Sequence, residues 1–123
     1  MTSSPYILIV DDSESIRFLL EFVLKNAGYN VTLTASGSEA LQAANSKAYD
    51  AVLADINMPE MDGFELIRQL RGMDSYTNTP IITITLNNTP ERIHKMRDVG
   101  ATGWIAKPFD PITMLSTLNK LLH

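Results

Sequence analysis

The chain has 123 residues, of which 45% are hydrophobic and 20% charged, values that predict one soluble globular domain over residues 1–123 and no second domain. A formal net charge of −4 argues against direct DNA binding, because lysine and arginine neutralise phosphates. The absence of cysteine excludes disulfides and thiolate sites, and the lack of a signal peptide or membrane-length apolar segment predicts a cytoplasmic protein.

The first half of the chain reads as three strands separated by two helices. Residues 6–10 form a continuous apolar run, typical of a strand covered on both faces. A helix ended by Gly28 follows, with apolar residues at helical spacing: Ile16, Leu19, Leu20, Val23, Leu24 and Ala27. Residues 31–35 alternate like a half-buried strand, and the next helix has a serine cap and an apolar face of Ala40, Leu41 and Ala44. Residues 51–55 predict a third strand.

The second half continues this alternation. Residues 63–73 predict a short helix with an apolar side of Phe64, Ile67 and Leu70. A strand over 80–86 precedes a helix with Thr89 as cap, Pro90 at its first position and Gly100 at its end. A short strand over 102–106 leads to a final helix capped by Asp110, with apolar residues Ile112, Leu115, Leu118 and Leu122. The pattern predicts an α/β fold, (βα)₅ and doubly wound, with a parallel sheet and helices on both faces.

Polar side chains follow four of the predicted strands, at the edge where an open parallel sheet binds ligands. Asp11 and Asp12 follow the first strand, Asp55 ends the third, Thr85 lies near the end of the fourth and Lys107 follows the fifth. Four of them have an ordinary alternative: a helix cap for Asp11 and Asp12, β-propensity for the threonine, and a solvated loop for the lysine. Asp55 is the hardest to explain in such a way. Five such coincidences at one edge favour a functional site.

Three neighbouring carboxylates repel one another, and a bound divalent cation removes the repulsion. Oxygen ligands without histidine or cysteine favour Mg²⁺, which also lets an acidic site accept phosphate. Lys107 and the Thr85 hydroxyl then have the chemistry to contact phosphoryl oxygens. One carboxylate, most centrally Asp55, is expected to act as a nucleophile and form an acyl phosphate.

Read together, these residues closely resemble the receiver domain of two-component response regulators, of the stand-alone chemotaxis-regulator type. The resemblance covers essentially the whole chain and rests on "ILIVDDSESIR", "DAVLADINMPEMDGFELIRQLR" and "GATGWIAKPFD". It implies a flavodoxin-like five-stranded sheet of order 2-1-3-4-5. It also implies Asp55 as the phosphorylated residue, Asp12 as a direct Mg²⁺ ligand and Asp11 as one acting partly through water, with Mn²⁺ an accepted substitute.

The resemblance assigns the remaining site residues as well. The backbone carbonyl of Asn57 matches a metal ligand, Thr85 the switch hydroxyl, and Lys107 the phosphate-binding lysine, whose bond to Pro108 is commonly cis. Trp104 matches the aromatic switch position, with a part-buried filler as the even alternative. The turn around Gly63 is expected to relieve backbone crowding beside the site.

The implied function is a phosphorylation-activated signalling switch rather than an enzyme. The expected phosphodonor is the phosphohistidine of a histidine kinase or histidine phosphotransfer protein, and the expected output is a downstream protein target. No membrane partner is expected, and the chain is expected to be a monomer or a phosphorylation-dependent dimer. The signalling face would comprise the fourth helix, fifth strand and fifth helix, including Ile93, His94, Arg97, Trp104, Ile105 and Met114.

Several positions depart from the family or stand outside it. Leu86 replaces the usual small residue after the switch threonine, and we expect it to crowd Asp55 or restrict Thr85. Asn57 and Asn87 occupy positions that modulate phosphoryl lifetime, without an evident general base. Phe18 and Phe22 lie one helical turn apart; partial cover by neighbours is slightly favoured over an exposed docking patch for a histidine-bearing helix. His94 and His123 lack ligand spacing and are expected to be solvated.

Three other functions compete with a phosphoacceptor. A flavodoxin-like cofactor binder would carry a Gly/Ser/Thr-rich phosphate loop after the first strand, where this chain has the acidic "DDSES". An aspartate-nucleophile phosphohydrolase would need a second catalytic acid or base near the nucleophile. A degenerate receiver acting as a phosphorylation-independent binding module is disfavoured by the intact set Asp12, Asp55, Thr85 and Lys107.

Overall fold

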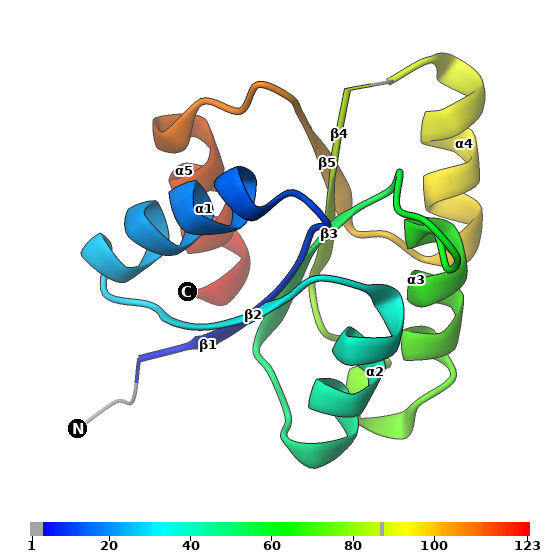
Figure 1. The fold of residues 1–123 in the computed structure, drawn as a ribbon, viewed down its shortest axis with the longest axis horizontal. Coiled ribbons are helices and arrows are strands. Elements are labelled where there is room, and N and C mark those ends of the chain that lie inside the picture. Colours follow the sequence, from blue (N-terminus) through cyan, green and yellow to red (C-terminus); the bar gives the residue numbers. More distant parts are fainter. Residues whose placement is uncertain (1–3, 87) are drawn as a thin grey trace.

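The computed structural model describes residues 4–86 and 88–123, and within them five strands alternate with five α-helices (Figure 1). In chain order the elements are β1 Tyr6–Val10, α1 Glu14–Asn26, β2 Asn30–Thr34, α2 Gly37–Ser46, β3 Ala51–Asp55, α3 Gly63–Arg71, the 3₁₀ turn η1 Asp74–Tyr76, β4 Ile81–Thr85, α4 Pro90–Val99, β5 Gly103–Ala106 and α5 Pro111–Leu122. None of the helices in these two ranges is long and apolar enough to cross a membrane.

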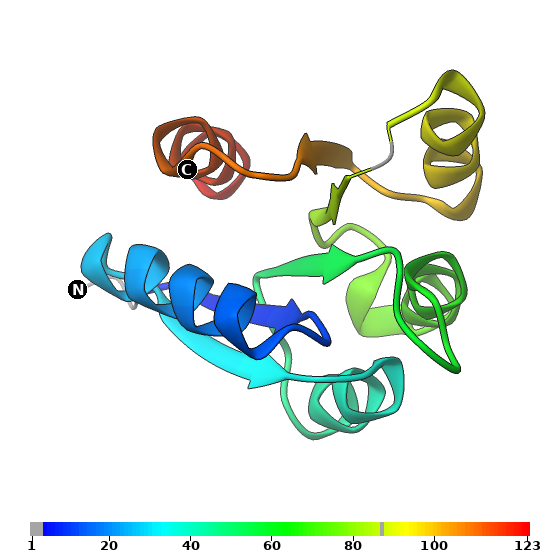
Figure 2. The same ribbon diagram turned by 45° about the horizontal axis from the view of Figure 1, so that its top comes forward.

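The strands form one parallel sheet in the order β2-β1-β3-β4-β5. This confirms the predicted doubly wound (βα)₅ fold and its strand order. The carboxyl ends of the central strands lie at nearly the same height in the sheet: Val10 of β1 pairs with Ala54 of β3, and Asp55 of β3 pairs with Ile84 of β4. The loops that leave β4 and β5 lie at the top of Figure 1, and Figure 2 brings that end forward. Residues just beyond these strands therefore meet at one edge.

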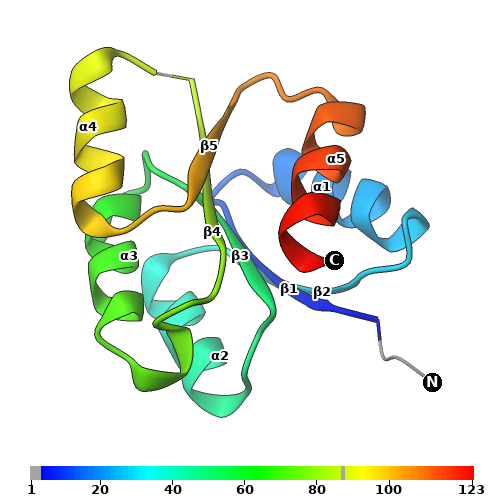
Figure 3. The ribbon, with the colours of Figure 1, turned by 180° about the vertical axis from the view of Figure 1, so that it is seen from behind.

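Helices cover both faces of the sheet, α1 and α5 on one side and α2, α3 and α4 on the other (Figure 3). The side chains of β1 alternate between the two layers: Ile7 and Ile9 pack with the α1 and α5 residues, while Leu8 and Val10 pack with the opposite layer. Because both faces are covered, the central strands have no polar face, which explains their continuous apolar sequences.

Side-chain caps fix where the helices begin. The side chains of Ser13, Ser36, Asp62, Thr89 and Asp110 each accept a hydrogen bond from a backbone N–H in the first turn of α1 to α5 respectively. Gly28 and Gly100 have φ of 95° and 103°, the left-handed conformation predicted for the residues that end the first and fourth helices. The helix starts predicted from cap residues are confirmed.

The predicted apolar stripes are only partly correct. Leu19 and Ile112 are exposed at 45% and 78%, whereas Met114, outside the stripe, is fully buried. A helix on a flat sheet buries a narrow arc, so residues at the margin of a stripe face solvent. Ala27 also lies at an exposed helix end, and α3 stops at Arg71, two residues earlier than predicted.

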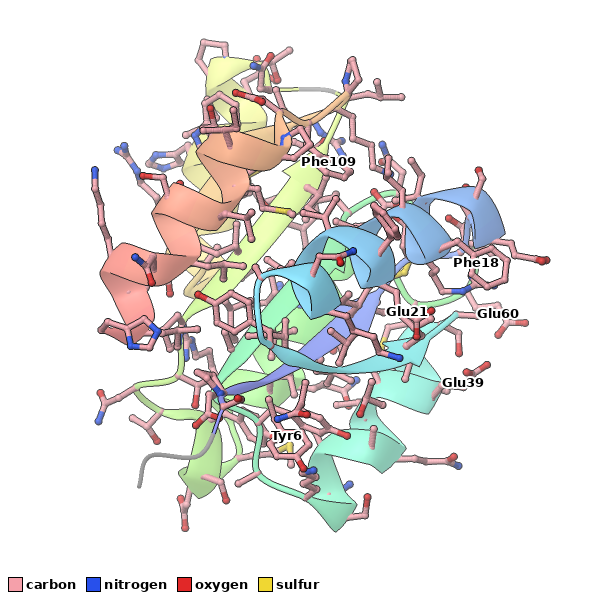
Figure 4. The ribbon with its side chains drawn as sticks, turned by 90° about the vertical axis from the view of Figure 1, so that its left-hand side faces the viewer. Tyr6, Phe18, Glu21, Glu39, Glu60 and Phe109 are labelled. Atoms are coloured by element: carbon pink, nitrogen blue, oxygen red, sulfur yellow. The ribbon has the colours of Figure 1, made fainter. Side chains whose placement is uncertain are left out.

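Partial cover of Phe18 and Phe22 by neighbouring elements, the favoured interpretation, is wrong. These side chains are exposed at 59% and 69%. Figure 4 shows Phe18 on α1 with the acidic side chains of Glu21, Glu39 and Glu60 on the same side of the molecule. The outer surface of α1 therefore presents aromatic groups beside acidic ones, whereas Phe109, before α5, packs partly against the core.

Candidate functional site

Two neighbouring strands bring three carboxylates together. Asp11 and Asp12 directly follow β1, and Asp55 is the last residue of the adjacent strand β3. One carboxylate oxygen from each residue lies within 4.8 Å of the other two. Asp11 and Asp55 are buried, whereas Asp12 is exposed. The predicted acidic cluster therefore exists, and one member faces solvent.

Lys107 supplies a cation to this cluster. It lies in the loop after β5, where its backbone N–H donates to the Thr85 carbonyl at 2.9 Å and its peptide bond to Pro108 is cis, as expected. Its Nζ lies 3.1 Å from Asp11 Oδ2 and 3.5 Å from Asp55 Oδ1, with the side chain 13% exposed. One ammonium is thus shared by two buried carboxylates.

Asp11 is held by several other groups. The Ser13 backbone N–H donates to Asp11 Oδ1 at 2.9 Å, so with Lys107 both of its carboxylate oxygens accept hydrogen bonds. The Arg17 Nη1 donates to the Asp11 backbone carbonyl at 2.6 Å. Arg17 was not among the predicted site residues; a basic residue in the helix following the acidic pair was the available signal. These contacts fix Asp11 and leave Asp12 the more accessible carboxylate.

The electrostatic environment of Asp55 disfavours its charged form. Burial and the nearby Asp11 carboxylate raise the pKa of Asp55, while Lys107 and the Asn57 backbone N–H, 3.3 Å from Oδ1, lower it by less. The net shift is upward, so the single ammonium does not offset the cost of a buried anion. A divalent cation would reverse this balance, and the all-oxygen donor set is the kind that hard ions prefer.

Replacing Asp55 by asparagine is expected to stabilise the metal-free protein at pH 7 by about 1–2 kcal/mol, a rise in Tm of roughly 3–6 °C. The folded-state pKa of Asp55 is raised, so its carboxylate does not destabilise the fold at a pH below the unfolded-state pKa of about 3.9. The loss of folding free energy grows as pH rises from there through the folded-state pKa. Thermal unfolding in chelator should therefore show a stabilisation that grows from acidic to neutral pH. A pH-independent Tm difference would contradict this electrostatic assignment.

A tight turn after β3 carries the chain past the cluster. The Gly63 N–H donates to the Ile56 carbonyl at 2.9 Å. A Cβ on Gly63 would lie 2.5 Å from the Asp55 carbonyl oxygen and 2.7 Å from Ile56 Cα. Met58, within the turn, is buried. The predicted role of Gly63 in relieving backbone crowding is therefore supported by the close approach of α3 to the end of β3.

Thr85 and Trp104 lie at and near the same end of the sheet. Thr85 is fully buried at the end of β4, one residue beyond the partner of Asp55. Trp104 pairs with Thr83 across β4 and β5, is 38% exposed, and lines a pocket of about 220 Å³ with Ile93 and Arg97 of α4. The switch roles of Thr85 and Trp104 stay predictions.

Only part of the residue set predicted for the signalling face lies at the surface. Ile93, His94, Arg97 and Trp104 are exposed or half-buried on α4 and β5. Ile105 and Met114, however, are buried in the layer between the sheet and helices α1 and α5, so they are not surface contacts. The reason is the alternation of β5: Trp104 and Ile105 point to opposite faces of the sheet.

The structure describes two of the positions at which the sequence departs from the pattern it resembles. Leu86 is 72% exposed just after β4, and its expected crowding of Asp55 stays a prediction. The exposed Asn57 accepts a hydrogen bond at its Oδ1 from Arg92 Nη2 at 2.9 Å. Sequence reasoning missed Arg92, because no local pattern links residues 35 positions apart. The expectation for Asn87 falls outside the described residues.

No other cluster competes with this one for a metal in the described parts of the chain. The Asp11, Asp12 and Asp55 group is the only set of three or more His, Cys, Asp or Glu side chains there with ligand atoms close enough to share an ion. His94 is largely exposed and lies 3.5 Å from Asp98, one turn along α4, as expected for a solvated histidine. Within residues 4–86 and 88–123, the donor groups suited to a divalent ion therefore lie at the ends of β1 and β3.

Comparisons with known proteins agree with this geometry. The sequence model of the family described as "Response regulator receiver domain" matches residues 7–119. The structure of chemotaxis protein CheY4 from Vibrio cholerae has a TM-score of 0.94 and 43% identity, covering 97% of this chain and 99% of that one. The receiver domain of sensor histidine kinase PA1611 from Pseudomonas aeruginosa, solved with a magnesium ion coordinated in its active-site cleft, has a TM-score of 0.90 and 30% identity, covering 97% and 98%.

Curated relatives include longer proteins. The uncharacterized transcriptional regulatory protein YkoG of Bacillus subtilis is 36% identical over 119 residues, which is 96% of this chain and 51% of the relative. This chain spans about half the length of the first two curated relatives that it matches, 51% and 56%. The similarity therefore concerns one domain of those proteins.

Proposed function

The chain belongs to the response regulator receiver domain family, and from this premise we propose that Asp55 accepts a phosphoryl group from the phosphohistidine of a histidine kinase or phosphotransfer protein. The observation that carries the proposal is the convergence of three carboxylates and Lys107 at the ends of β1, β3 and β5. Receiver domains are signalling domains, and this one would assist only its own phosphorylation and dephosphorylation.

Magnesium fits the donor set, and Mn²⁺ would be able to substitute for it. Asp12 is exposed and would ligate directly, together with Asp55 and the backbone carbonyl of Asn57. Asp11 would act partly through water, since its two oxygens already accept hydrogen bonds from Ser13 and Lys107. When bound, the ion supplies positive charge that offsets carboxylate repulsion and the charge of the phosphoryl oxygens. The magnesium ion in the PA1611 receiver supports this choice.

The chain's own groups then account for the transfer. A carboxylate oxygen of Asp55 attacks the phosphorus, forming an O–P bond as the N–P bond of the phosphohistidine breaks. The bonding electron pair stays on the imidazole nitrogen: a ring protonated at its other nitrogen leaves as neutral imidazole, and an unprotonated ring takes a proton from solvent. Lys107 Nζ, now 3.5 Å from Asp55 Oδ1, would contact a phosphoryl oxygen, and the Thr85 hydroxyl another. The protein contributes mainly position and charge.

The resulting acyl phosphate would shift an equilibrium between two similar conformations of the α4–β5 side of the molecule. Thr85 would shift toward the phosphoryl group and the Trp104 ring would follow that movement. Output would pass through α4, β5 and the exposed part of α5 to a downstream protein target rather than to DNA or membrane. We further propose that the domain acts in the cytoplasm as a monomer or as a phosphorylation-dependent dimer.

The exposed aromatics of α1 suit the docking of the phosphodonor. A Phe18→Ala, Phe22→Ala variant is expected to slow phosphotransfer from a histidine-bearing helix by about tenfold or more. Each aromatic side chain that the docked partner covers contributes on the order of 1 kcal/mol or more to binding. Stopped-flow transfer at limiting donor checks this. Acetyl phosphate needs no docking surface, so its reaction rate is the control and should not change. Unchanged transfer kinetics in the folded variant would eliminate the docking role.

Leu86 offers a second test near the acceptor. Leu86→Ala is expected to raise the rate of phosphorylation by small donors a few-fold, since the shorter side chain would widen access to Asp55 or free Thr85 to move. Initial rates with acetyl phosphate at saturating Mg²⁺ measure the effect. Equal or faster rates in the parent would show that Leu86 does not restrict the site.

The function itself is tested by intact-mass measurement after incubation with acetyl phosphate and Mg²⁺. We expect one labile phosphoryl adduct on the parent chain and none on Asp55→Asn. Tight binding of flavin without an adduct would support a cofactor binder instead, and steady release of phosphate over many turnovers would support a phosphohydrolase. An adduct-free parent that still binds partners would support a degenerate receiver.

A further inference from the structure

Helix α4 is attached to the rest of the molecule by few apolar groups. Met96 is its one buried residue among those described, and its sequence PERIHKMRDV is rich in charge. Two of its cations lie over the same aromatic ring: Arg92 at 5.4 Å and Lys95 at 4.4 Å from the centroid of Phe64, on α3. The two side chains therefore carry the same charge, belong to the same helix and contact the same aromatic ring.

Only one of these two cations reaches the turn beside the acidic cluster. Arg92 Nη2 donates to Asn57 Oδ1 at 2.9 Å, whereas Lys95 has no hydrogen bond to Asn57. Asn57 is also held through its backbone, since its N–H donates to Asp55 Oδ1 at 3.3 Å. The residue is thus fixed at its amide nitrogen by the acceptor aspartate and at its side chain by α4.

We propose that Arg92 is a positioning residue for the divalent-ion site. By holding the Asn57 side chain, it orients the peptide unit whose carbonyl would ligate the ion, and it ties the first turn of α4 to that ligand. The inference rests on the proposed function, because it concerns the same metal site. It adds a contact between α4 and the metal-binding turn that runs through a side chain outside the acidic cluster.

Positioning and simple electrostatics predict opposite signs. If Arg92 acted only as a positive charge near the carboxylates, its removal would strengthen binding of a cation. If it orients Asn57, its removal frees that side chain and weakens binding, despite the loss of repulsion. Lys95→Ala is a matched control, since it removes the same charge from the same helix and ring while leaving the bond to Asn57 intact.

The experiment is a calorimetric titration of the full chain with Mg²⁺. We expect Arg92→Ala to weaken binding about fivefold, the effect of one charge-assisted hydrogen bond, and Lys95→Ala to leave it equal or slightly tighter. Asn57→Ala should weaken binding to a similar extent, and adding Arg92→Ala to it should weaken binding no further. If Arg92→Ala instead matches Lys95→Ala, the inference is overturned. Thermal unfolding in chelator verifies that each variant is folded.

Amide hydrogen exchange gives a second readout, independent of affinity. Coupling is reciprocal, so Mg²⁺ should slow exchange of the amides of residues 91–94 in the parent and not in Arg92→Ala. Equal slowing in both would overturn the inference while leaving the proposed function intact. If the parent binds no Mg²⁺, or if the Asp12→Ala variant binds Mg²⁺ with the same affinity as the parent, the proposed function is overturned and this inference with it.

Discussion

Lys107→Met is expected to slow phosphorylation of Asp55 by about 100-fold, the usual effect of removing one preorganised donor from a developing anionic centre. The substitution keeps an unbranched side chain, shorter by one atom, but removes the ammonium that lies 3.1 Å from Asp11 and 3.5 Å from Asp55. Mg²⁺ binding should become tighter at the same time, because a competing cation has left the pocket. Slower transfer with tighter metal binding is a combination that general unfolding does not produce.

The same variant should be less stable without metal. Asp11 and Asp55 are 1% and 5% exposed, and Lys107 is their shared cation, so its removal is expected to cost about 2 kcal/mol in chelator. Saturating Mg²⁺ should recover most of that loss. Lys120→Met, an exposed position on α5, is the control and should change neither rate nor stability. An unchanged phosphorylation rate in Lys107→Met would remove this lysine from the account.

Gly63→Ala is expected to destabilise the fold by about 3 kcal/mol, lowering Tm by roughly 10 °C. The added Cβ would lie 2.5 Å from the Asp55 carbonyl oxygen and 2.7 Å from Ile56 Cα, both backbone atoms of a buried strand end. Neither atom moves without shifting the acceptor residue or α3. Mg²⁺ affinity should therefore fall together with stability, as seen by thermal unfolding and calorimetry.

Gly72→Ala provides the matched control for that steric argument. Gly72 lies at the end of α3 with φ of −77° in the right-handed helical region, and its nearest contact to an added Cβ is 3.4 Å. The same substitution there should leave Tm within about 2 °C of the parent. If Gly63→Ala is as stable as Gly72→Ala, the close approach of α3 to β3 does not constrain the turn.

Much of the fold follows from local chemistry. The apolar runs of β1 and β3, the cap residues Thr89 and Asp110 and the left-handed Gly100 each act within a few positions, so the sequence alone was sufficient to place them. The stripes of α1 and α5 were less exact, because which margin of a helix meets the sheet depends on how the helix is rotated against it.

The segment after α3 had no sequence signal at all. Tyr76, in the 3₁₀ turn, is fully buried; its hydroxyl accepts from the Tyr49 N–H at 3.3 Å and donates to the Lys47 carbonyl at 2.9 Å. Arg71 similarly donates from Nε to the Gly100 carbonyl at 2.9 Å. Both contacts join residues far apart in the chain, and neither shows as a periodicity or a turn motif.

The acidic site was predictable because each of its aspartates lies at a strand end, and the local sequence is enough to locate a strand end. Asp11, Asp12 and Asp55 meet once the sheet is parallel and β1 lies beside β3. The different roles of Asp11 and Asp12 do not follow from the strand ends; only the family resemblance implied them. Asp11 accepts from Ser13 and Lys107 while Asp12 faces solvent, and this depends on the path of the loop into α1.

The most direct test is the rate of Asp55 phosphorylation by acetyl phosphate as Mg²⁺ is titrated into chelated protein. We expect no adduct in chelator, and a rate that saturates at the same Mg²⁺ concentration as the calorimetric binding curve. An adduct on Asp55 that forms equally fast without divalent cation would contradict the account, since the buried carboxylates would then need no counter-charge to accept a phosphoryl group.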